Sequence, residues 1–179
     1  MYIVLIILLI AAAVYFLTRK KSTSVILPPE AYEKLLEDEV EYYRNLEPSG
    51  KSTFISLVSE FLKDTTIEGV GTEVTSLDRV LIASSAVIPI FGFPEWKYKN
   101  LTNVILYPDT FDHDFQFEGG DRNILGMVGS GYMNGQMILS RAALVKGFSK
   151  SAGQENTAIH EFVHLLDNQT ELQMGFPKT

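Results

Sequence analysis

The chain has 179 residues, of which 46% are hydrophobic and 21% are charged, and this predicts one folded domain with a short appendage. Its formal net charge of −7 argues against nucleic-acid binding, because such proteins need a basic surface. The chain contains no cysteine, so disulfides, thiolate metal ligands and cysteine nucleophiles are excluded.

The first residues differ from the rest of the chain. Residues 2–17 form an uninterrupted apolar run, and Arg19, Lys20 and Lys21 follow it directly. As a helix this run covers about 24 Å, and basic side chains at its end can make up the difference from a hydrocarbon core of about 30 Å. A cleavable signal peptide is the alternative, but it carries its positive charges before the apolar core. We therefore expect residues 1–21 to be a single-pass membrane anchor, with the following domain in the cytoplasm by the positive-inside rule.

The remaining residues, 30–179, are expected to fold as one domain that a linker at residues 22–29 connects to the anchor. Apolar residues recur at helical spacing in three segments, and Ser76 and Gly92 are candidate N-cap and stop signals for the third. The three predicted helices cover residues 30–45, 51–63 and 78–91.

Strand-like sequences fill the middle of the chain. Residues 103–107 (NVILY) are strand-like and end at Pro108, and residues 125–133 and 136–139 flank the pair Asn134-Gly135. That pair between apolar runs predicts a hairpin with a two-residue turn. With helices before these strands and one helix after them, the order predicts an α+β domain with a small antiparallel sheet.

A final helix is expected at residues 153–167, with Ser151 and Gln154 as its capping box. It carries the sequence His160-Glu-Phe-Val-His164. Residues four apart share one face of a helix, so the two imidazoles can bind the same ion. Neutral imidazole is a good zinc ligand, and catalytic zinc has three protein ligands and a water. The motif therefore predicts that His160 and His164 bind Zn²⁺.

Glu161 lies beside the first histidine and can reach a water on that ion. Zinc lowers the pKa of the water to about 7, so the carboxylate can take its proton while the oxygen attacks a peptide carbonyl. This chemistry predicts a zinc-dependent peptidase that acts on peptide or protein substrates, with Glu161 as general base. The alternative is that these are ordinary polar residues on a packed helix, although burying all three without a metal is costly.

Four segments also carry a family resemblance. They are VTSLDRVLIASSAVIPIFGFP at residues 74–94, VILYPD at 104–109, GQMILS at 135–140 and IHEFVHLLD at 159–167. They resemble the family of Mlc titration factor A, the glucose-regulated zinc metallopeptidases, from about residue 42 to residue 177. The resemblance implies a zincin-like α+β fold of the gluzincin type, with His160 and His164 as zinc ligands and Glu161 as general base.

The resemblance also implies a third zinc ligand, a glutamate on a helix well downstream of the motif, with a tyrosine near it. Neither fits in the 15 residues from His164 to Thr179, so we expect the sequence to be the N-terminal portion of a longer protein. His113 is a conceivable further donor, but such a residue is more often a solvated loop histidine. Asp167 is expected to support a ligand or to end the helix.

If the site is incomplete, the alternative function is a non-catalytic, membrane-tethered binding or regulatory module on the same scaffold, with a regulatory protein as its partner. A metal-stabilised structural domain is less favoured, because two ligands rarely hold structural zinc. Residues 136–140 also have two interpretations. Zincins commonly align substrate along an edge strand above the motif helix, whereas this segment could equally be a core strand of the hairpin.

Overall fold

The computed structural model describes residues 29–93, 95–98, 100–109, 126–128, 135–149 and 156–174. The expected anchor and nearly all of the expected linker lie outside these residues. In the described part of the chain, no helix is both long enough and apolar enough to cross a bilayer.

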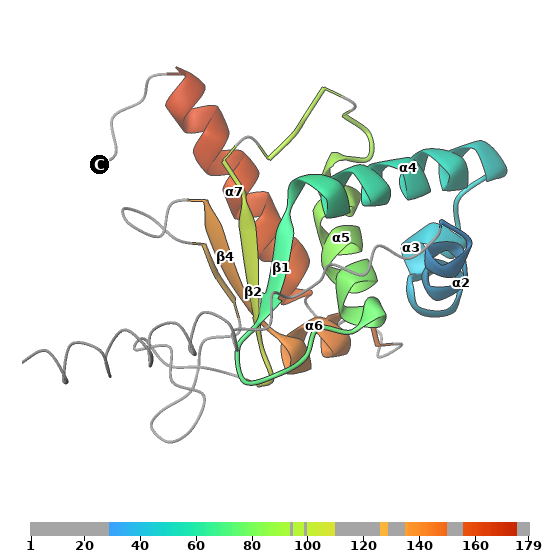
Figure 1. Cartoon of the computed structure of the whole chain (residues 1–179). Coiled ribbons are helices and arrows are strands. Elements are labelled where there is room, and N and C mark those ends of the chain that lie inside the picture. The colour runs from blue at the N-terminus through green and yellow to red at the C-terminus, as the bar shows by residue number, and fades with distance from the viewer. Residues whose placement is uncertain are drawn as a thin grey trace, which may run out of the picture.

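A four-stranded sheet with the order β1-β2-β4-β3 lies at the centre of the described domain (Figure 1). β1 and β4 both pair parallel to β2, whereas β3 pairs antiparallel to β4 at the edge of the sheet. The prediction of an antiparallel sheet is therefore wrong for the sheet as a whole and holds only for the β3–β4 pair. The strands are β1 Thr66–Gly69, β2 Asn103–Tyr107, β3 Gly126–Val128 and β4 Gln136–Ser140.

The parallel pairing of β1 with β2 follows from a strand that the sequence analysis does not predict. β1 comes directly after α4 (Pro48–Asp64), and α5 (Ser76–Ile90) then connects β1 to β2. Neighbouring strands joined through a helix run parallel, because the helix carries the chain back to the starting edge of the sheet. β1 has four residues and Ile67 is its buried side chain, which is too short an alternation to be recognised in the sequence.

The connection between β3 and β4 is longer than the predicted two-residue turn. Val128 pairs with Met137, so residues 129–136 lie between the two paired positions. β4 also has a partner on each side, β2 and β3. Residues 136–140 are therefore an internal strand of the sheet and are not available as an edge that aligns a substrate.

Gly135 has a different role from the one that the hairpin signal predicts. Its carbonyl accepts hydrogen bonds from the backbone N–H groups of Thr102 and Asn103, at 2.8 and 3.1 Å. Its φ is +89°, and a Cβ atom there would lie 2.7 Å from the carbonyl oxygen of Asn100. A glycine is needed at this position because the start of β4 approaches the start of β2 so closely.

The first predicted helix is two helices, α2 (Pro29–Glu39) and α3 (Glu41–Arg44). Val40 between them is extended, with φ −111° and ψ 98°. The Arg44 guanidinium donates hydrogen bonds to the carbonyls of Glu37 and Asp38, at 3.1 and 2.9 Å. Arg44 thereby satisfies carbonyls at the end of α2 that the break leaves without helical partners.

α4 and α5 confirm the other two predicted helices with shifted ends. Thr75, rather than Ser76, is the N-cap of α5: its hydroxyl accepts from the Asp78 N–H at 3.2 Å, and the Asp78 carboxylate accepts from the Thr75 N–H at 2.7 Å. Further along the chain lie α6 (Arg141–Gly147), which the sequence analysis does not predict, and α7 (Thr157–Met174).

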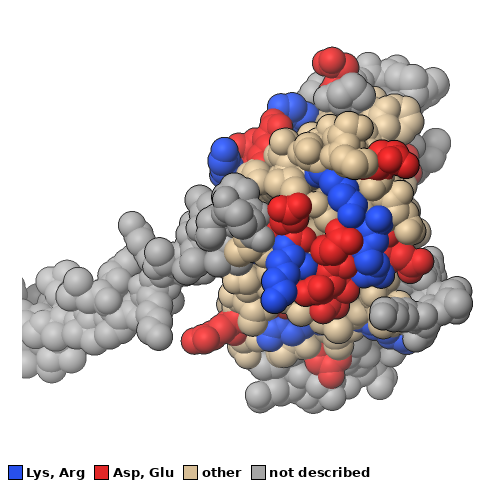
Figure 2. All heavy atoms as spheres, turned by 90° about the vertical axis from the view of Figure 1, so that its right-hand side faces the viewer, with Lys and Arg blue, Asp and Glu red and all other residues tan. Residues whose placement is uncertain are grey.

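The core lies where α4, α5 and α7 meet one another and the sheet (Figure 1). The face formed by α2, α3 and α4 carries interleaved acidic and basic side chains, among them the ion pair of Lys51 and Glu37 at 2.8 Å (Figure 2). The largest fully buried side chains are Tyr43, Phe54, Phe162, Leu36, Ile67, Leu81, Ile82, Leu106, Met137, Ile138 and Leu139.

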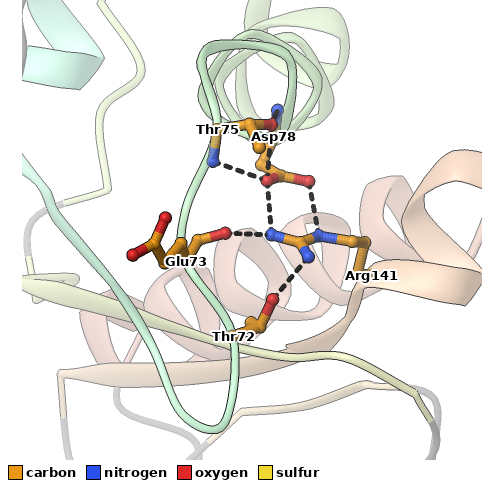
Figure 3. A network of polar contacts seen from close by, with 5 residues as sticks. All are labelled: Thr72, Glu73, Thr75, Asp78 and Arg141. Carbon is orange, nitrogen blue, oxygen red and sulfur yellow. Dashed lines mark hydrogen bonds and ion pairs between the residues drawn. The ribbon is translucent and has the colours of Figure 1, made fainter.

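A largely buried ion pair connects α5 to α6 (Figure 3). Arg141 donates from Nε and Nη2 to the two carboxylate oxygens of Asp78, at 2.9 and 2.7 Å, and the Asp78 side chain is 3% exposed. The same guanidinium donates to the hydroxyl of Thr72 and to the carbonyl of Glu73 in the loop that follows β1. These contacts hold the β1–α5 loop against the start of α6.

Asp78→Ala is therefore expected to lower the free energy of unfolding by about 3 kcal/mol, because it leaves the Arg141 guanidinium without its carboxylate and removes half of the α5 capping box. Glu37→Ala, which removes an exposed ion pair, is the control and should cost less than about 1 kcal/mol. Urea denaturation measures both values. Equal midpoints for the two variants would contradict the role given to the Asp78–Arg141 pair.

Candidate metal centre

α7 carries the His-Glu-x-x-His motif and begins later than predicted. Asn156 is its N-cap, because the side-chain Oδ1 accepts a hydrogen bond from the Ile159 N–H at 3.1 Å. The predicted capping residues Ser151 and Gln154 lie outside the described residues and precede this start. Gly147 at the end of α6 makes room for the cap, since a Cβ atom there would lie 2.7 Å from the Asn156 side chain.

One face of α7 packs into the core. Phe162 is fully buried, and its ring lies against the rings of Phe61 and Tyr98, with centroid separations of 5.7 and 5.2 Å. His160 and His164 are exposed, because residues two positions before and after Phe162 lie on nearly the opposite side of a helix. The buried residues of this face are Ala158, Phe162, Leu165 and Leu166.

The structure brings the two imidazoles together. Their Nε2 atoms lie 2.9 Å apart, and the ring centroids lie 4.3 Å apart with the planes at 79°. Two nitrogen ligands of a tetrahedral zinc, each at about 2.0–2.1 Å, are about 3.3 Å apart. A small rotation of either ring reaches that spacing, so the pair fits two positions of one zinc coordination sphere.

Glu161 projects from α7 between the exposed and the buried faces and is half-buried. Burial raises the pKa of its carboxyl above the usual value, while His164 and His160 act in the opposite direction. A raised pKa makes the carboxylate a better proton acceptor near neutral pH.

The described residues bring two candidate metal ligands together, His160 and His164, without a third. Within them, no group of three His, Cys, Asp or Glu side chains could hold a metal ion. His113 lies outside the described part of the chain. α7 continues to Met174, so Asp167 is an exposed residue inside the helix and does not end it, contrary to one of its two predicted roles. Glu171 is about 10 Å along the helix axis from His164, which is too far for both residues to bind the same ion.

A mixed domain of helices and a small, mainly parallel sheet, with this motif on its last described helix, is consistent with a metallopeptidase domain. A family model described as glucose-regulated metallo-peptidase M90 matches residues 16–179, and the chain belongs to this family, that of Mlc titration factor A. The resemblance seen in the sequence is thus confirmed, and membership implies a metal cofactor. No curated protein matches the chain significantly.

Proposed function

We propose that this metallopeptidase-type domain is a zinc-dependent peptidase, in which His160 and His164 hold the zinc ion and Glu161 is the general base. The observation that carries the proposal is the convergence of the two Nε2 atoms to 2.9 Å beside a half-buried carboxyl. The donor set also suits zinc, which binds neutral imidazole well. Peptides or proteins are the substrates.

Zinc, when bound there, supplies a Lewis acid that polarises the scissile carbonyl and makes a water acidic near neutral pH. Glu161 accepts a proton from the water while the water oxygen adds to the carbonyl carbon. The same carboxyl then gives that proton to the amide nitrogen as the C–N bond breaks, so the amine leaves neutral and Glu161 returns to its ionised form. The packing of Phe162 keeps His160, Glu161 and His164 in position for these proton transfers.

A second candidate function is a non-catalytic binding or regulatory module on the same scaffold. It is favoured by the absence of a third ligand among the described residues, because catalytic zinc uses three protein ligands. For the peptidase, the third ligand comes from outside the described residues.

Zinc binding tests the ligand assignment. The protein, purified together with whatever sequence follows Thr179, should hold about one zinc per molecule, and His160→Ala or His164→Ala should lose it because each removes one of the two converging imidazoles. The chain has three histidines, so His113→Ala is a chemically matched control that should retain zinc. Zinc is measured by elemental analysis after dialysis. Equal zinc in the wild type and in both motif variants would refute the assignment.

Hydrolysis separates the general base from the ligands. Glu161→Gln should keep zinc, since the carboxylate is not a ligand, and should lower the rate of hydrolysis of a peptide mixture by about 10²–10⁴-fold. The wild-type rate should disappear with a chelator and return with zinc. Near wild-type hydrolysis by the Glu161→Gln variant would contradict the general-base role. Zinc binding without any hydrolysis by the wild type would instead favour the binding module.

We also propose that residues 1–21 anchor the chain in a membrane with the metallopeptidase domain in the cytoplasm. Support comes from the charge-free run at residues 2–17 and the three basic residues after it. A reporter that is active only in the cytoplasm, fused after Thr179, should give signal, and one active only outside should not. Signal from the external reporter alone would reverse the orientation, and a mature N-terminus after Leu17 would replace the anchor by a signal peptide.

A further inference from the structure

A cavity of about 560 Å³ lies between α4, α5 and residues 96–98, 101 and 102. Its wall includes the rings of Phe61 and Tyr98 and the apolar side chains of Val87 and Leu101. The residues that line it do not include His160, Glu161 or His164, so it is separate from the candidate metal centre. Its volume is in the range of cavities that hold small organic molecules, about 300–1,000 Å³.

Contacts within the protein fix the walls of this cavity. The Tyr98 hydroxyl donates a hydrogen bond to the Ala86 carbonyl at 2.7 Å, which attaches Tyr98 to α5. Trp96, which also lines the cavity, stacks on Phe93 with a centroid separation of 4.9 Å and an angle of 27°. These two contacts order part of the cavity wall in the absence of a ligand, which lowers the entropy cost of binding.

The charged side chains at the rim of the cavity favour a positively charged ligand. Glu60 and Asp64 lie one turn apart on α4 and both line the cavity. Lys97 is the one cationic side chain among the described lining residues, and it pairs with Glu60 at 2.5 Å. Two carboxylates therefore face one ammonium group, and the excess negative charge is available to a cationic ligand. Aromatic ring faces, such as those of Trp96, Tyr98 and Phe61, also attract cations.

We propose that this cavity binds a small organic amine, with an apolar body against the aromatic and aliphatic walls and a positively charged head near Glu60 and Asp64. Apolar lining selects the body, and the acidic rim selects the amine over neutral or anionic molecules of the same shape. The site is distinct from the metal centre and does not depend on peptidase activity.

Trp96 reports on this binding, because it is the single tryptophan of the chain and lines the cavity. The full chain in phosphatidylcholine nanodiscs is titrated with 4-phenylbutylamine, 4-phenylbutanol and 4-phenylbutanoate, and tryptophan emission is excited where phenyl groups do not absorb. The amine should give a saturable change at the lowest concentration. The carboxylate should bind at least about fivefold more weakly than the amine, because the excess rim charge repels it.

Two double variants with the same change in net charge localise the effect. Glu60→Gln/Asp64→Asn should weaken amine binding by about fivefold and leave the alcohol unchanged. Glu37→Gln/Asp38→Asn, on α2 and outside the cavity lining, should leave both unchanged. These exposed or half-exposed positions are not in the core, so both variants should fold. No saturable emission change with any probe, carboxylate binding as tight as amine binding, or equal effects of the two double variants would each overturn the proposal.

Discussion

The rotation of α7 about its own axis is set by Phe162, and the candidate metal centre depends on that setting. Phe162 is fully buried and packs against the rings of Phe61 and Tyr98. A helix turns by about 100° per residue, so this one contact directs positions 160 and 164 to the opposite, solvent-facing side. A rotation by a single residue would turn a histidine toward the core and leave its ring nitrogens without water or a metal, which is costly.

The position of α7 along its axis depends on a second set of contacts. Asn156 starts the helix, and the close approach of its side chain to Gly147 places that start against the end of α6. α6 follows β4 directly and is held to the β1–α5 connection by the pair of Asp78 and Arg141. The position of α7 is thus set by the parallel sheet through one short helix, α6. A substitution at Asp78 would therefore change the position of the candidate metal centre, although Asp78 does not contact it.

The sequence predicts what depends on neighbours within one element. The two histidines and the glutamate are four residues or fewer apart on one helix, so their spacing alone predicts their convergence. The parallel pairing of β1 with β2 depends on β1, which has too few residues to show a pattern, and the break at Val40 leaves carbonyls of α2 whose partner, the Arg44 guanidinium, lies on the next helix. The Asn134-Gly135 pair indicates a tight turn. The glycine is instead required because the Asn100 carbonyl, just before β2, lies so close to it.

The two sides of α7 lie in different surroundings. The imidazoles face solvent, where a substrate and a metal ion can reach them. Phe162 instead faces Phe61 and Tyr98, two rings that also line the cavity between α4 and α5. Tyr98 belongs both to the cavity wall and to the packing that fixes Phe162, and its hydroxyl is held by α5. Aromatic rings in a close-packed core cannot shift independently of their neighbours. Phe61 and Tyr98 thus separate the cavity from the buried face of α7 by one layer of side chains, and His160 and His164 lie on the opposite, exposed face.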